Sequence, residues 1–308
     1  MLFFLRHCNF HKILNILICF FLIENVFSND ILLYSKEPSE TASIAELVLE
    51  SFKQGYPKEI SEIGYDRNVS DWFLIVNNKK FYWAAGRFLP LKYSKQIKKW
   101  RPYVDYKYPF EIPNPKNFTK DDIEKIRIVT NSENRELEPP YHLDFFDALY
   151  DGKTRRKIES HIINTKFLGK NVNVHEKIVD KLFLIENEIY ELAKIDEEIK
   201  TFLTHLQSIE GYNWREIADS QSRSYHSWGI ALDILPKGWR KKNLYWNWIR
   251  SWNKDWMLIP LEKRWTPPEI VINIFEKYGF IYGGKWIMWD NMHFEYRPEL
   301  ILLRDWEK

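Results

Sequence analysis

The sequence predicts an α+β fold in which helices flank a small antiparallel sheet. Apolar residues between Ile178 and Leu206 recur at spacings of three and four, or sums of these, which is typical of a long amphipathic helix. Short apolar stretches at residues 229–235 and 292–296 are typical of strands. Helices grouped around a few short strands in this way indicate the α+β class.

Local signals mark the ends of two helices. Asn173 and Glu176 resemble a capping box at the start of the long helix. A second helix is predicted between a capping residue, Thr266, and a terminating glycine, Gly279.

The first half of the chain is harder to interpret. Residues 71–90 alternate around Asn77 and Asn78, which predicts two strands joined by a turn. Residues 103–117 are rich in proline and aromatic residues and are expected to form an irregular connection. No catalytic motif is recognised in residues 31–140.

Tryptophan is unusually frequent, with 14 residues in the chain. Four aromatic residues lie at helical spacing and are interpreted as one apolar helix face that packs into a core: Tyr245, Trp248, Trp252 and Trp256. The alternative is an aromatic platform or lid for a glycan or peptide.

Length and composition narrow the class of protein. A chain of 308 residues with 45% hydrophobic residues can bury a sizeable core in one large domain or two smaller ones. The formal net charge is only +2, and no basic run is clustered enough to follow a phosphate backbone. Nucleic acid is therefore not expected as a partner.

The N-terminus is typical of an exported protein. Arg6 and Lys12 precede an apolar run at residues 13–23, and a small-residue site follows at residues 26–28. This order predicts a cleaved signal peptide over residues 1–28. The run is shorter than the roughly 20 residues needed to span a bilayer, so no stable membrane span is expected after cleavage.

Both cysteines, Cys8 and Cys19, lie within the predicted signal peptide. The mature protein would therefore contain no thiol and no disulfide. This composition fits an oxidising compartment, where a stray thiol could mispair. The expected location is periplasmic, or extracellular and associated with the cell wall.

A histidine and an aspartate seven residues apart provide the first signal of chemistry. Asp233 lies between Leu232 and Ile234, and an ionised carboxylate in such an apolar strand needs a partner or a metal. On a straight strand, His226 and Asp233 would face opposite sides, so joint ligation requires a bend. Gly229 lies where that bend is needed and can adopt an unusual backbone conformation.

A second segment, Trp289 to Glu295, can complete this site. His293 would be the third ligand, and two histidines with one carboxylate leave an open position on a tetrahedral zinc ion. Asp290 could act as a general base toward a water in that position. Glu295, two residues after His293, is the alternative base or a hydrogen-bonding partner of the ligand.

These motifs resemble the zinc signature of the D-alanyl-D-alanine carboxypeptidases and dipeptidases. Residues 224–233 match its pattern Ser-x-His-x-x-Gly-x-Ala-x-Asp, and a carboxylate-x-x-His follows near the C-terminus. The resemblance implies an α+β fold shared with the hedgehog signalling domain and activity on peptidoglycan peptides. It also implies one Zn²⁺ per chain, held by His226, Asp233 and His293.

One residue departs from the carboxypeptidase pattern. Those enzymes usually have glutamate as the base, whereas Asp290 resembles the L-alanyl-D-glutamate endopeptidases of the same family. The cleaved bond is therefore left open between carboxypeptidase and endopeptidase types.

Arginine and serine candidates accompany the metal ligands. Residues 211–215 resemble the segment that supplies an arginine to the active site, which implies that Arg215 binds substrate or the developing oxyanion. A surface salt bridge is the alternative for Arg215, and Arg223 is a nearby rival for the role. Ser224 is expected to support the site, by contact with substrate or with the backbone.

The signal-peptide pattern and the resemblance together predict three segments. Residues 1–28 are expected to be the signal peptide, residues 29–140 an N-terminal extension of unknown role, and residues 141–308 the zinc peptidase domain. The other histidines of the mature chain have no recognised ligand spacing and are interpreted as structural or exposed: His142, His161, His175 and His205.

A non-catalytic zinc-containing module that binds the cell wall is the alternative function. A base beside an open coordination position has no use in such a module, so Asp290 favours an enzyme. The sequence does not determine the oligomeric state.

Overall fold

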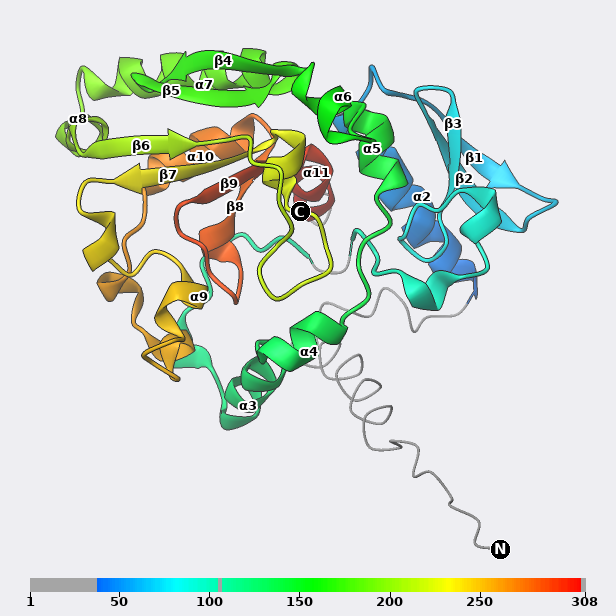
Figure 1. Cartoon of the computed structure of the whole chain (residues 1–308), viewed down its shortest axis with the longest axis horizontal. Coiled ribbons are helices and arrows are strands. Elements are labelled where there is room, and N and C mark those ends of the chain that lie inside the picture. Colours follow the sequence, from blue (N-terminus) through cyan, green and yellow to red (C-terminus); the bar gives the residue numbers. More distant parts are fainter. Residues whose placement is uncertain (1–37, 105–106, 306–308) are drawn as a thin grey trace, which may run out of the picture.

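The computed structural model describes residues 38–104 and 107–305 (Figure 1). The predicted signal peptide at residues 1–28, with Cys8 and Cys19, lies outside the described residues. Within the described ranges, no helix combines the length and the apolar character that crossing a membrane requires.

The predicted α+β class is confirmed, and the central feature is a four-stranded antiparallel sheet. Its strands, in spatial order, are β6 (Leu206–Glu210), β7 (Ala231–Pro236), β9 (His293–Tyr296) and β8 (Phe280–Tyr282). Helix α10 (Glu269–Lys277) packs on this sheet, as Figure 1 shows. It ends before Gly279 as predicted, but it begins at Glu269, three residues after the predicted cap Thr266.

The predicted long helix is correct only in its middle. Asn173 is not a cap, because it belongs to a hairpin of β4 (Ile162–Phe167) and β5 (Lys170–His175), where its side chain accepts a hydrogen bond from Asn164 at 2.9 Å. The helix instead begins after His175.

The same helical pattern is interrupted near its end. Helix α7 (Glu176–Ala193) ends early because the Asp196 carboxylate accepts the backbone N–H groups of two following residues and starts a new helix, α8 (Glu197–Thr204). Leu206, predicted to be helical, is the first residue of β6.

The predicted strand pair around Asn77 and Asn78 is confirmed as β2 (Asp71–Val76) and β3 (Lys79–Tyr82). Both asparagines have positive φ, as a type I′ hairpin turn requires. A strand that the sequence did not indicate, β1 (Ile60–Asp66), completes this second sheet.

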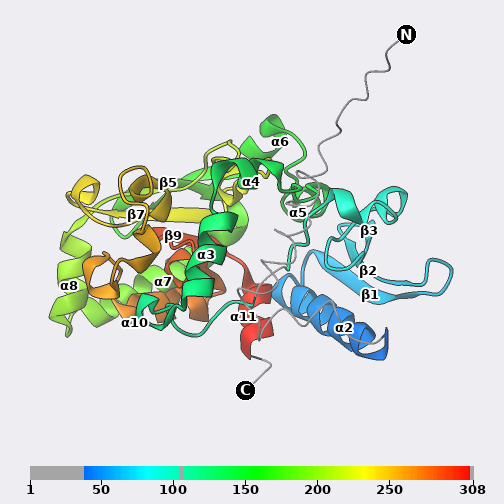
Figure 2. The ribbon, with the colours of Figure 1, turned by 90° about the horizontal axis from the view of Figure 1, so that it is seen from below.

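The remaining helices connect and cover these sheets. Figure 2 shows α2 lying against α11, two helices from opposite ends of the described chain. These helices are α2 (Pro38–Gly55), α3 (Lys120–Val129), α4 (Ser132–Leu137), α5 (Asp144–Tyr150), α6 (Arg155–Glu159), α9 (Trp246–Ile249) and α11 (Pro298–Asp305).

One continuous core joins the first part of the chain to the rest. Buried apolar residues from Ala45 to Val104 pack in the same cluster as residues from Phe145 to Leu300. Across this boundary the Tyr56 hydroxyl donates to the Glu299 carboxylate at 2.9 Å. The sheet of β1, β2 and β3 and the sheet that carries the site therefore share one core.

The four aromatic residues expected on one helix face do not share one. Helix α9 is a single turn, and the chain then bends where the Trp252 N–H donates to the carbonyl of Ile249. Trp256 is buried at 2% exposure, whereas Trp248 is 43% and Trp252 is 69% exposed. The expectation of a uniform core stripe was wrong.

His175 is a structural residue with a testable pH dependence. Its buried ring accepts the Lys177 N–H through Nδ1 at 3.1 Å and donates from Nε2 to the Tyr150 carbonyl at 3.2 Å. The contact at Nδ1 requires the neutral ring, because a protonated Nδ1 has no lone pair to accept with. Burial lowers the pKa of His175 to about 4. Because the unfolded chain binds this proton near pH 6.5, stability falls as the pH drops from about 6.5 to 4.

We expect His175→Asn, which can still cap α7, to remove this dependence. Between pH 7 and 4.5 the wild type should lose about 2–3 kcal/mol more stability than the variant, measured by urea unfolding. His205→Asn, at an exposed histidine, is the control and should follow the wild type. Parallel loss in all three proteins would contradict the assignment.

Candidate active site

Two predicted metal ligands are brought together by the register of β7 and β9. Asp233 lies directly opposite His293, so both side chains project from the same face of the sheet. The Asp233 Oδ1 atom is 2.9 Å from His293 Nδ1. This pair joins residues that are 60 positions apart in the sequence.

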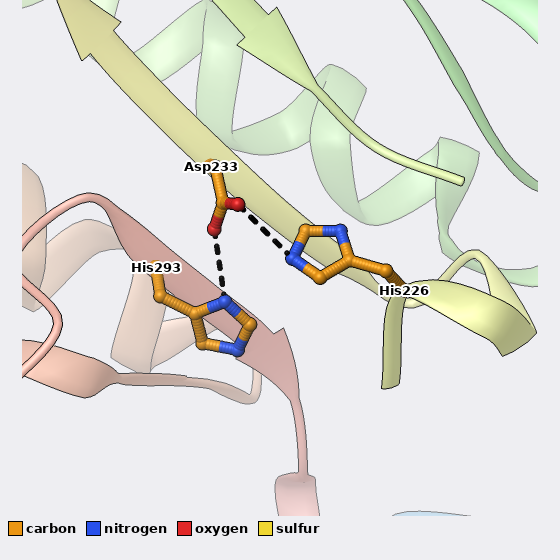
Figure 3. A group of neighbouring side chains, drawn as sticks. All are labelled: His226, Asp233 and His293. Carbon is orange, nitrogen blue, oxygen red and sulfur yellow. Dashed lines mark hydrogen bonds and ion pairs between the residues drawn. The ribbon is translucent and has the colours of Figure 1, made fainter. Parts of the chain in front are cut away.

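A tight turn adds His226 to the pair. His226 lies in a 3₁₀ turn, Tyr225–Trp228, where the Ser224 hydroxyl accepts its backbone N–H at 3.4 Å. The turn ends at Gly229, whose φ is +68°, which confirms the predicted bend. His226 Nε2 consequently lies 3.3 Å from Asp233 Oδ2 (Figure 3).

These three residues fit a metal ion. One potential ligand atom from each lies within 4.8 Å of the other two. His226 Nδ1 donates to the carbonyl of Gly211 at 2.7 Å, so Nε2 of the neutral ring carries a lone pair. That Nε2 is buried without a hydrogen-bond partner and faces a carboxylate oxygen. A cation between the two acceptors would satisfy both, and zinc prefers such nitrogen and oxygen ligands.

Glu295 orients the second histidine. Its carboxylate accepts from His293 Nε2 at 3.0 Å, which leaves Nδ1 directed at Asp233. Arg297 Nη1 lies 3.5 Å from the same carboxylate. A carboxylate that holds the outer nitrogen of a histidine ligand fixes its tautomer and makes it more basic. Burial lowers the pKa of His293, but the hydrogen bonds to Asp233 and Glu295 outweigh burial and raise it to about 10.

Asp290 occupies the turn before β9, as predicted. It pairs with Tyr245 through an isolated β-bridge, and its Oδ1 atom is buried without a hydrogen-bond partner. Burial, together with the negative charge of Asp233, raises the pKa of Asp290 to about 8. A carboxyl group with a pKa near neutrality can both accept and return a proton.

The two arginine candidates have different surroundings. Arg223 forms an ion pair with Asp147 at 2.6 Å and also donates to the Gly152 carbonyl, so it holds α5 in place. Arg215 lines the same cleft as the metal ligands, and its charge lowers the pKa of Asp290.

Ser227 is a positioning residue that the sequence reasoning did not single out. Its buried hydroxyl accepts the Arg215 N–H at 2.9 Å and contacts the Arg215 carbonyl at 2.7 Å. In the sequence, the signal for this role was the position of Ser227 within the motif at residues 224–233. Ser224 also lines the cleft, while its hydroxyl supports the His226 turn.

The site lies in a cleft of about 1090 Å³. Its walls come from the sheet and from the earlier part of the chain, where no motif was recognised. Residues from that earlier part include Arg101, Tyr103, Ile126, Val129, Arg135 and Glu138. No local pattern predicts these contributions, because they depend on how distant segments pack.

The other histidines belong to no metal-ligand cluster among the described residues. His142 and His175 are buried, His205 is exposed, and His161 lies 2.9 Å from the Glu176 carboxylate.

The Gly229 turn gives a test of how the fold places His226. A Cβ atom at Gly229 would lie 2.5 Å from Ile162 Cδ1 and 2.8 Å from the His175 backbone nitrogen, in addition to the strain of positive φ. Gly229→Ala should therefore destabilise the protein by about 2–5 kcal/mol. It should also weaken zinc binding, because His226 must shift away from Asp233.

Gly238→Ala is the matched control. Gly238 has φ +69°, and a Cβ atom there meets nothing within 4 Å. It should cost about 1–2 kcal/mol of stability and leave zinc affinity unchanged. Urea unfolding and competition with a metal chelator measure both quantities, and equal zinc affinity in the two variants would contradict the role given to Gly229.

Comparison with known families agrees with this geometry. Residues 218–296 match a family described as D-alanyl-D-alanine carboxypeptidase, and residues 48–105 match a family described only as a domain of unknown function. Comparison with curated proteins and with solved structures gives no significant match. The matched segment carries His226, Asp233 and His293, so the family match supports a peptidase.

Proposed function

We propose that this chain is an exported zinc metallopeptidase that hydrolyses a peptide bond in peptidoglycan stem peptides. The carboxypeptidase and endopeptidase types remain the two forms of the proposal. The observation that carries it is the buried lone pair of His226 Nε2, which faces Asp233 and His293 in a cleft beside Asp290.

His226, Asp233 and His293 would hold the metal. When bound, zinc supplies a Lewis acid that polarises a carbonyl and lowers the pKa of a water to about 7. Asp290 accepts a proton from the attacking water as the bond from oxygen to the carbonyl carbon forms. It then gives that proton to the leaving amine as the bond from carbon to nitrogen breaks. Arg215 binds the substrate carboxylate or the developing oxyanion.

Export is part of the proposal and rests on the sequence. Residues 1–28 have the order of charges, apolar run and small residues of a cleaved signal peptide. Removing them leaves a chain without cysteine, which suits an oxidising compartment. A periplasmic or cell-wall location would bring the enzyme to its polymer.

Purified peptidoglycan tests the function directly. The mature protein should release new stem-peptide fragments, identified by mass spectrometry, and the release should stop when a chelator removes the metal. The masses of the fragments identify the bond. Intact peptidoglycan in the presence of protein with one zinc per chain would favour the non-catalytic wall-binding module instead.

Substitution of the two carboxylates separates their roles. Asp290→Asn should lower kcat by about 10²- to 10⁴-fold while zinc stays bound, because the proton acceptor is lost. Glu295→Gln should instead weaken zinc binding by about 10- to 100-fold and regain much of its turnover at saturating zinc. Kinetics at several zinc concentrations distinguish the two, and full turnover by Asp290→Asn with zinc bound would rule Asp290 out as the base.

A further inference from the structure

Arg135 is a cationic residue of the cleft that the proposed mechanism does not use. It lies in α4, in a part of the chain between the two family matches, which cover residues 48–105 and 218–296. It nevertheless lines the same cleft as His226, Asp233 and His293. An arginine from outside the matched segments therefore lines the cleft that holds the site.

Among the described residues no carboxylate forms an ion pair with Arg135, although the charge of Glu138 acts on its guanidinium. Its Nη2 donates to the Ala218 carbonyl at 3.1 Å, its Nη1 lies 3.4 Å from the Met288 sulfur, and it packs over the Trp246 ring at 5.3 Å. Its Nε is buried without a hydrogen-bond partner. Burial lowers the pKa of Arg135, as expected where the positive charge is incompletely balanced.

Three other cations that line the cleft form ion pairs with carboxylates. Arg101 pairs with Glu138 at 2.8 Å, and Lys285 pairs with Glu276 at 2.6 Å. Arg297 pairs with Glu299. For Arg135 and Arg215, by contrast, the described part of the chain supplies backbone, sulfur and ring contacts only.

The two arginines act on one region of the cleft. Tyr245, which forms a β-bridge with Asp290, has its pKa raised to about 12 by burial and by the charge of Asp290, while the charges of Arg135 and Arg215 act in the opposite direction. Arg135, Arg215, Tyr245 and Asp290 all line the same cleft.

We propose that Arg135 binds a second carboxylate of the substrate, in addition to the group bound by Arg215. The substrate would be an acidic peptide with two carboxylates near the scissile bond. A guanidinium binds a carboxylate through charge-assisted hydrogen bonds, which are about twice as strong as neutral ones. The inference rests on the proposed function for the identity of the substrate.

The test uses stem peptides in which one carboxylate at a time is converted to the neutral amide. The wild type should favour the acid over one of its amides by about 10- to 100-fold in kcat/KM, the range typical of a charge-assisted hydrogen bond. Arg135→Gln should lose this preference, mainly by cleaving the acid form more slowly. Arg135→Lys should retain part of it, since the charge stays but the fork is lost.

Arg127→Gln is the matched control. Arg127 lies on the neighbouring helix α3, exposed, and pairs with Asp255 at 2.7 Å, so the variant removes the same charge near the cleft without removing a cleft residue. It should keep the wild-type preference. Thermal unfolding of all variants checks that Arg135→Gln is folded.

Binding of the same peptides, measured by calorimetry, needs no turnover and separates the two hypotheses. Tighter binding of the acid that depends on Arg135, without cleavage, would support this inference and contradict the proposed peptidase activity. Equal binding of acid and amides by the wild type, or an unchanged preference in Arg135→Gln, would overturn the inference even if the peptides are cleaved.

Discussion

The pairing register of β7 with β9 is the constraint on which the site depends. It places Asp233 opposite His293 and Ala231 opposite Glu295. Because side chains alternate along a strand, a slip of one residue would turn His293 and Glu295 to the other face and separate every partner in the site. The buried apolar neighbours of Asp233 on the opposite face hold this register, since a slip would expose them.

From His293 a chain of polar contacts leads out of the site. His293 donates to Glu295, Glu295 lies beside Arg297, and Arg297 contacts the Tyr225 hydroxyl at 2.7 Å and the Tyr103 carbonyl at 3.3 Å. Burying a charge is costly unless it is paired and hydrogen-bonded, as these groups are. These polar contacts link the candidate metal site to the turn at Tyr225–Trp228 and to the earlier part of the protein. That earlier part also contributes a wall of the cleft.

The sequence predicted what depends on local spacing and missed what depends on distant contacts. His226, Gly229 and Asp233 lie within eight consecutive residues, so the bend that joins them could be inferred. Asn173 was misread as a helix cap because a polar residue before an apolar pattern has the same local signal in a hairpin. Arg135 reaches the cleft only through the packing of α4, which no pattern around it encodes.

The contact of α2 with α11 determines when the molecule can fold. Helix α2 is the first helix of the described chain and α11 is the last. The shared core therefore cannot close until α11 has been synthesised. Contacts between such distant segments also form slowly, because a long loop must close first. Until its C-terminal helix is complete, a nascent chain of this kind therefore exposes apolar surface that the folded protein buries.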